Sequence, residues 1–171
     1  IIPLYGEWVS YEEALRRYRC AIRFVDAQIG RLLRFMAEKG LQDETLFIIT
    51  ADHGENLGEH SYFFNHYHLY DQTIHIPLIM QGPGFPEGIT IDGFVQHIDI
   101  VPTVLDILGY GFGAIDFDGK SLSPLIHDKV DQLRSSVYAE DAHWRSAVRS
   151  AVRTKEYKYI FASDPHGVNG E

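Results

Sequence analysis

The sequence predicts a mixed α/β fold, in which a largely parallel sheet is flanked by helices and followed by a small antiparallel subdomain. Three observations predict this fold. A long amphipathic pattern near the N-terminus is typical of a helix, two short and continuously apolar runs are typical of buried strands, and the last third of the chain changes to short alternating runs. The 171 residues, of which 45% are hydrophobic and 23% charged, are enough to bury one full core.

Residues 10–39 are predicted to form the first helix. Ser10, followed three residues later by Glu13, makes a capping box, because each side chain can satisfy a backbone N–H that has no partner inside the helix. Gly40 is the left-handed residue that ends the helix. The amphipathic pattern itself consists of apolar residues every three or four positions: Ala14, Tyr18, Ile22, Val25, Ile29, Leu32 and Met36.

Two apolar runs predict central strands of the sheet. Residues 45–50 are apolar or β-branched without interruption, too short for a helix and without the alternation of a half-exposed strand, so we expect a strand buried in a parallel sheet. Residues 76–80 predict a second such strand, with Pro77 near its start, where a missing N–H is tolerated. Asp99 is then predicted to cap a helix that runs to Leu108.

The C-terminal part of the chain has the alternating pattern of antiparallel strands. Residues 137–140 predict one short strand. A hairpin is predicted from residues 147–153 and 157–161, around a turn at residues 154–156.

Charge and hydropathy exclude two classes of partner. The 24 acidic and 15 basic residues give a formal charge of −9, which leaves no basic surface to hold a nucleic acid by counterion release. No apolar run approaches the roughly 20 residues that span a bilayer, so we expect no membrane partner. Cys20, the only cysteine, cannot form an internal disulfide, and its place in the first helix indicates a small thiol in the core. The sequence does not indicate a cellular compartment.

The stretch richest in chemistry begins where the first strand ends. Ligands of α/β sheets collect at the carboxyl ends of strands, so Asp52 and His53 are predicted to face a crevice. Both can reach one cation if the chain turns sharply, which Gly54 permits. A carboxylate beside an imidazole suits Mn, Zn or Fe, and further oxygen ligands would suit Ca or Mg. The alternative is that Asp52 forms an ordinary turn and His53 is a solvated loop residue.

Histidines are concentrated in the loop that follows. A polar, histidine-rich loop between two buried strands is a candidate site. A surface loop with accidental histidines is the alternative. Four of the nine histidines lie within residues 53–68, and a fifth follows before the second strand: His53, His60, His66, His68 and His75.

Six blocks of the chain carry a resemblance to a known family: residues 18–33, 49–55, 69–79, 95–105, 118–122, and 151–154 with 157–159. Together, and in this order, they resemble the C-terminal half of the catalytic domain of a sulfatase. The sulfatases belong to the alkaline-phosphatase-like superfamily, so the resemblance implies a mixed α/β sheet between helices and a small antiparallel C-terminal subdomain. It therefore assigns residues 1–115 to the C-terminal part of the α/β catalytic domain and residues 116–171 to an incomplete subdomain.

This resemblance implies part of an active site. Asp52 and His53 match the family pair that, with two N-terminal aspartates, holds one divalent cation, here Ca, Mn or Zn. His66 lies about where the family carries a Lys or His that contacts the anionic ester, with His68 as the alternative register. His60 is predicted to orient another group through a hydrogen bond, with a purely structural role as the alternative.

The nucleophile of the family does not occur in the 171 residues. Sulfatases use a cysteine, converted to formylglycine, or a serine in the motif Cys/Ser-x-Pro-x-Arg, whereas Cys20 is followed by Ala-Ile-Arg. We therefore expect the formylglycine in an N-terminal half that is missing here. A start at Ile1 and a turn-rich stretch at residues 164–171 likewise predict a fragment, which alone would have little or no turnover.

Three functions are compatible with these observations. The first is part of a metal-dependent hydrolase of small sulfate esters. The second is a phosphonate or phosphate ester hydrolase of the same superfamily, indicated by His53 where many sulfatases have Asn. The third is a non-catalytic metal-binding domain. An incomplete sheet would expose an edge and a large apolar patch, which argues against the third function and favours homo-oligomers.

Overall fold

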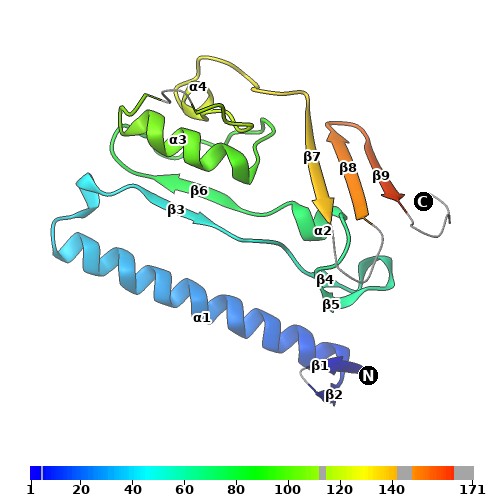
Figure 1. Ribbon diagram of the computed structural model, residues 1–171. Coiled ribbons are helices and arrows are strands. Elements are labelled where there is room, and N and C mark those ends of the chain that lie inside the picture. The colour runs from blue at the N-terminus through cyan, green and yellow to red at the C-terminus, as the bar shows by residue number, and fades with distance from the viewer. Residues whose placement is uncertain (5, 112–114, 142–147, 164–171) are drawn as a thin grey trace. The chain divides into compact units, whose positions relative to one another are not determined.

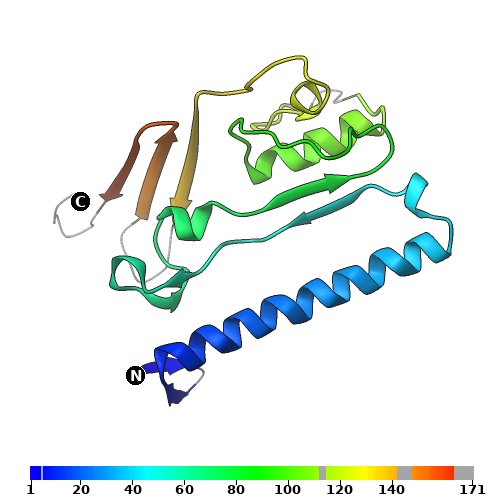
Figure 2. The ribbon, with the colours of Figure 1, turned by 180° about the vertical axis from the view of Figure 1, so that it is seen from behind.

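The computed structural model describes residues 1–4, 6–111, 115–141 and 148–163. They belong to two compact units, Ile1–Pro83 and Gly84–Glu171. Figure 1 and Figure 2 show the elements of both units from opposite sides. No helix in the described parts of the chain is long and apolar enough to cross a membrane.

The first unit begins with a hairpin and a long helix. β1 (Ile2–Leu4) pairs antiparallel with β2 (Glu7–Val9), and α1 spans Tyr11–Glu38. The side chain of Ser10 accepts a hydrogen bond of 3.1 Å from the backbone N–H of Glu13, and Gly40 has a left-handed φ of 67°. Both predicted ends of the helix are therefore confirmed. The Glu13 carboxylate contacts Arg16 and Arg17, at 2.8 Å each.

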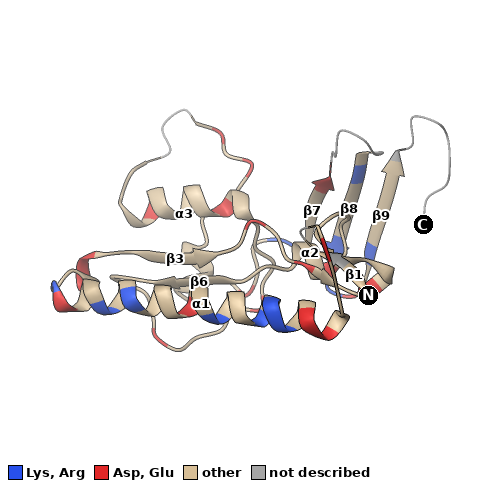
Figure 3. Ribbon diagram, turned by 90° about the horizontal axis from the view of Figure 1, so that it is seen from below, with Lys and Arg blue, Asp and Glu red and all other residues tan. Residues whose placement is uncertain are grey.

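The predicted burial of α1 is wrong for the described part of the chain. Ala14 is the only residue of the helix that is buried there, and Cys20 is exposed rather than a core thiol. Apolar residues such as Ile22 and Leu32 are about half exposed. Figure 3 shows acidic and basic residues spread along the same helix. The spacing of the apolar residues thus predicted the helix correctly, but its apolar side is only partly covered, with Ile29, Leu33 and Met36 half-buried.

The two central strands pair antiparallel, not parallel as predicted. β3 (Phe47–Thr50) and β6 (Leu78–Gln81) are in register from Phe47 opposite Gln81 to Thr50 opposite Leu78. A parallel pair needs a crossover, usually a full helix. The one-turn α2 (Asp71–Ile74) is the only α-helix among the described residues of this connection, so the chain returns beside the strand it left. Every sheet of the described residues is antiparallel.

Short elements shape the connections in this unit. The 3₁₀ turn η1 (Gln42–Glu44) precedes β3. Between β3 and β6, a small ribbon is formed by β4 (Asn56–Leu57) and β5 (Phe63–Asn65), with the 3₁₀ turn η2 (Glu59–Ser61) between them. The histidine-rich loop contains this ribbon and α2.

The described part of the second unit contains two α-helices and a three-stranded sheet. The 3₁₀ turn η3 (His97–Asp99) leads into α3 (Ile100–Ile107), and α4 (Ser123–Ile126) follows. The strand order is β7-β8-β9, all antiparallel. These strands, which confirm the predicted C-terminal pattern, span Ser136–Asp141, Val148–Thr154 and Lys158–Ser163.

A buried ion pair organises the second unit. Asp99 was predicted to cap the helix, but its side chain makes no capping bond to α3. Its carboxylate is fully buried and accepts hydrogen bonds from Arg134, at 2.5 and 2.6 Å, and from the backbone N–H groups of Gln96 and Lys120, at 2.7 and 2.8 Å. Asp99 therefore ties three separate segments of the unit together.

Candidate active site

Asp52 and His53 lie directly beyond the end of β3. The hydroxyl of Thr50 donates to the carbonyl of Pro77 at 2.8 Å, which fixes the end of the strand. One carboxylate oxygen of Asp52, Oδ1, accepts from the backbone N–H of His53 at 3.0 Å, and Oδ2 lies 3.6 Å from Nε2 of His53. The hydrogen bond from the His53 backbone lowers the pKa of Asp52, and the charges of the His53 and His66 rings lower it further.

The geometry of His53 suits a metal ligand. Its Nδ1 lies 2.8 Å from the carbonyl oxygen of Gly54. Histidines that bind metals usually donate their other ring N–H to a carbonyl or carboxylate. In the tautomer that carries its proton on Nδ1, the lone pair of Nε2 lies near the Asp52 carboxylate, and a cation between these two groups would stabilise both. The Asp52 side chain is 88% exposed, so its oxygens are accessible to such a cation.

Gly54 is needed here for close packing. Its φ is not in the left-handed range, so the predicted reason for this glycine, freedom to turn, is not the one that the structure shows. A Cβ atom at this position would lie 1.9 Å from the carbonyl oxygen of Gln72. The backbone N–H of Gly54 donates to the carbonyl of Thr73 at 2.7 Å. The loop after β3 is therefore pressed against the segment that contains α2.

The structure brings His66 to the Asp52–His53 pair. The rings of His53 and His66 are stacked, with centroids 3.9 Å apart and planes at 20°. His66 follows β5 and is exposed. The imidazole of His66 therefore forms one cluster of polar groups with the imidazole of His53 and the accessible carboxylate of Asp52. These groups come from two separate parts of the loop.

The other two predicted histidines lie against tyrosines. His60 stacks on Tyr70, with centroids 3.8 Å apart and planes at 8°, and His68 contacts the ring of Tyr62 at 4.1 Å. Both histidines have left-handed backbones, with φ of 52° and 82°. Between the two alternative ester-contacting residues, His66 is therefore the one that stacks on His53.

Two residues of this region were not anticipated from the sequence, Glu55 and Asn56. Burial raises the pKa of the Glu55 carboxyl, an effect that the charges of His66 and His53 oppose. Its Oε1 atom is buried and has no hydrogen-bond partner among the described residues. Asn56 is completely buried and donates hydrogen bonds to the loop that carries His66. In the sequence, the only indication that Glu55 and Asn56 have a role at this site is that they directly follow the Asp-His-Gly sequence. Neither residue belongs to a motif with its own chemistry.

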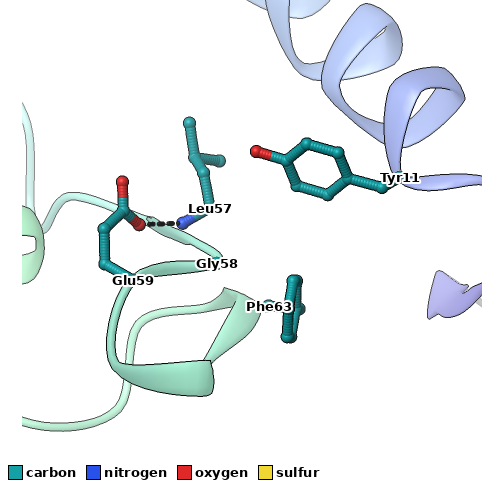
Figure 4. A pocket seen from close by; sticks show the side chains of 5 residues that line it. All are labelled: Tyr11, Leu57, Gly58, Glu59 and Phe63. Carbon is teal, nitrogen blue, oxygen red and sulfur yellow. Dashed lines mark hydrogen bonds between the residues drawn. The ribbon is translucent and has the colours of Figure 1, made fainter.

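A pocket of about 400 Å³ lies elsewhere in the first unit (Figure 4). The rings of Tyr11 and Phe63 meet edge to face, with centroids 6.2 Å apart, and the Glu59 carboxylate accepts from the backbone N–H of Leu57 at 2.7 Å. Its other lining residue is Gly58, so none of the predicted site residues lines it.

The metal-ligand set is incomplete in the part of the chain that the structure describes. No group of three or more His, Cys, Asp or Glu residues there is arranged to hold a metal ion. Asp52 and His53 provide two suitable donors, and a closed first shell needs at least two more. The chemistry of the pair fits a divalent cation, and its geometry fits half of a site.

The chain belongs to the sulfatase family, because the family model named Sulfatase matches residues 6–110. This confirms the family that the six blocks predicted. Members of the family typically use a divalent cation. Arylsulfatase K of Homo sapiens is 33% identical over 147 residues, which are 81% of this chain and 27% of that protein. N-acetylglucosamine-6-O-sulfatase of Bacteroides thetaiotaomicron is 32% identical over 159 residues, 88% of this chain and 28% of that protein.

Solved structures agree with this assignment. A phosphonate monoester hydrolase from Silicibacter pomeroyi matches with a TM-score of 0.72 and 28% identity, over 82% of this chain and 31% of that one. A 2-O GAG sulfatase matches with a TM-score of 0.78 and 24% identity, over 88% of this chain and 34% of that one, which supports the fold. The chain spans about a quarter to a third of the length of these relatives.

Proposed function

We propose that this chain is the part of a sulfatase-type ester hydrolase that supplies two metal ligands and an anion-contacting histidine. The observation that carries this proposal is the cluster of Asp52, His53 and His66, in which the two imidazole rings are 3.9 Å apart beside an accessible carboxylate. We assign residues 1–115 to the C-terminal part of the α/β catalytic domain and residues 116–171 to its antiparallel subdomain. The nucleophile, a formylglycine or serine in this family, would come from a segment outside these residues.

Each residue of the cluster has a distinct role in this proposal. Asp52 and His53 hold one divalent cation, Ca, Mn or Zn. When bound, the cation supplies positive charge that stabilises the negative charge developing on the ester oxygens. His66 donates a ring N–H to a non-bridging oxygen of the ester, and His68 is the alternative for this role. His60, stacked on Tyr70, positions the loop.

The substrate in this proposal is a small anionic sulfate ester. A phosphonate or phosphate ester is the second candidate, and two observations favour it. His53 occupies the position where many sulfatases have Asn, and a phosphonate monoester hydrolase is among the solved structures that match, at 28% identity. The sequence of the segment that carries the nucleophile would separate the two candidates.

Calorimetric titration of Mn²⁺, Ca²⁺ and Zn²⁺ into the chain tests the proposed ligands. We expect binding of at least one cation to the wild type and its loss in the double variant Asp52→Asn/His53→Ala. His75→Ala is the matched control, because it removes an exposed imidazole from the same loop while the backbone N–H of His75 keeps its bond to Asp71. Equal binding by the double variant and the wild type would contradict the proposal.

A further inference from the structure

We propose that Asn56 is the positioning residue that holds His66 against Asp52 and His53, an inference that rests on the function proposed above. Asn56 is the first residue of β4 and lies three residues after His53. It is the largest of the completely buried side chains in the described residues, with 0% of its surface exposed. A buried amide in a short surface ribbon needs a physical reason, because burying polar groups costs free energy unless they are hydrogen bonded.

The contacts of the Asn56 side chain enclose His66. Its Nδ2 donates to the carbonyl of Asn65 at 3.0 Å and reaches the carbonyl of Tyr67 at 3.4 Å. These two carbonyls stand on either side of His66 in the chain. One amide group therefore restrains the backbone on both sides of the histidine.

The same amide also connects this segment to the helix α2. Nδ2 of Asn56 lies 3.1 Å from the hydroxyl of Thr73, whose backbone carbonyl accepts from Gly54 at 2.7 Å. Residues 54–56 are thus bound to Thr73 at both ends. Asp52 and His53 immediately precede this segment. The hydrogen bonds of Asn56 and Gly54 therefore hold the metal-ligand pair and His66 to the same part of the structure.

The Asn56 amide acts as a donor only. Its Oδ1 atom is buried and has no hydrogen-bond partner in the described part of the chain, as is also true of Oδ1 of Asn65. An unpaired buried acceptor is destabilising, so the NH₂ group accounts for the local benefit of this side chain. An isosteric carboxylate would remove both N–H donors and place a charge among backbone carbonyls.

The consequence for the site is control of the distance between His66 and His53. Placement errors of about 1 Å in a catalytic group are enough to reduce rates about 100-fold. The stacked rings, 3.9 Å apart, depend on a loop that contains four non-glycine residues with positive φ, and such a loop holds its shape only when its surroundings restrain it. Those four residues are His60, Ser61, Phe64 and His68.

NMR spectra of the histidine rings in the full chain test this inference. Stacked rings shift each other's proton signals, so the signals of His53 and His66 report their mutual position. We expect both to move toward the values of free histidine in Asn56→Asp, and to move less in Thr73→Val, which removes one of the three contacts. Thr103→Val is the matched control, because Thr103 is equally buried in the second unit and its hydroxyl bonds to Asp99 and Leu122 among the described residues.

A second readout is the affinity for inorganic sulfate, measured with and without the divalent cation. We expect Asn56→Asp to weaken sulfate binding about 10- to 100-fold, as for losses of groups that orient the residues of a site, and Thr103→Val to leave it unchanged. If Asn56→Asp does not fold, Thr73→Val decides. Wild-type positions of both ring signals in the folded Asn56 and Thr73 variants would overturn the inference. A wild type that binds neither cation nor sulfate would contradict the proposed function and leave the ring signals as the test of Asn56.

Discussion

Asp52 and Asp99 show how two carboxylates of one chain can have opposite surroundings. Asp99 is completely buried and receives hydrogen bonds from Arg134 and from two backbone N–H groups. Asp52 is 88% exposed, and the contacts recorded for its carboxylate come from His53, its neighbour in the chain. A carboxylate surrounded by protein donors stabilises the fold, whereas one whose oxygens are largely accessible can bind a ligand. The comparison therefore separates a structural aspartate from the proposed metal ligand.

The largest expected effect is on stability at the buried pair. Asp99→Ala leaves the largely buried guanidinium of Arg134 without its partner, and removing one member of a buried ion pair costs about 3–5 kcal/mol. Asp52→Ala should change the free energy of unfolding by less than about 0.5 kcal/mol, as is usual for exposed sites. Urea denaturation followed by circular dichroism measures both. Similar losses in the two variants would remove the distinction between the two aspartates.

Two glycines also distinguish the surroundings of Asp52 and Asp99, because each glycine packs against backbone near one of these aspartates. A Cβ on Gly119 would lie 1.9 Å from the carbonyl oxygen of Ile98, next to Asp99, and a Cβ on Gly54 would lie 1.9 Å from that of Gln72. We expect Gly119→Ala and Gly54→Ala each to destabilise its unit by about 1–3 kcal/mol or more. Gly54→Ala should in addition reduce cation binding, and Gly119→Ala should not. Calorimetry on both folded variants checks this, and loss of binding in both would show that the effect is not local.

We expect the pKa values of Asp52 and Asp99 to respond differently to added salt. Burial raises the pKa of Asp99, but hydrogen bonds from Arg134 and from the backbone of Lys120 and Gln96 lower it by more, so the net shift is downward. The stabilisation from ionised Asp99 is therefore fully present above its unfolded pKa of about 3.9 and is lost as the pH falls through the lower folded value. The lowered pKa of Asp52 arises at an exposed site.

Carbon NMR of the two carboxyl groups, titrated at low and at high salt, measures this difference. Exposed charges are screened by salt and buried pairs much less. We expect added salt to move the pKa of Asp52 toward the ordinary value and to leave that of Asp99 in place. Equal salt responses would contradict the assignment of the two environments.

The sequence predicted local features well and non-local ones poorly, for physical reasons. Ser10 and Gly40 mark the ends of α1 because capping depends on residues adjacent in the chain. The direction of the β3–β6 pair was mispredicted, because a continuously apolar run gives the length of a strand and says nothing about the direction of its neighbour. The predicted burial of Cys20 was wrong for a similar reason, since the amphipathic pattern predicts an apolar face of the helix without predicting what covers it.

The candidate site shows the same division. Asp52 and His53 were found because they directly follow a strand, and His66 because of the density of histidines and the resemblance to the family. The stacking of His66 on His53 required the structure, because the two residues lie thirteen positions apart in the chain and their meeting, in our proposal, depends on hydrogen bonds of Asn56. Likewise, Arg134 lies 35 positions from Asp99, and no local pattern links the two.

We propose that Asp52 and His53 form the metal-binding part of a site that includes His66. Paramagnetic broadening by Mn²⁺ of the histidine ring signals tests it most directly, because broadening increases steeply as the distance to the ion decreases. We expect substoichiometric Mn²⁺ to broaden the signals of His53 first and those of His66 next, and we expect Asp52→Asn to abolish this selectivity. Selective broadening of other histidines, or the same pattern in Asp52→Asn, would contradict it.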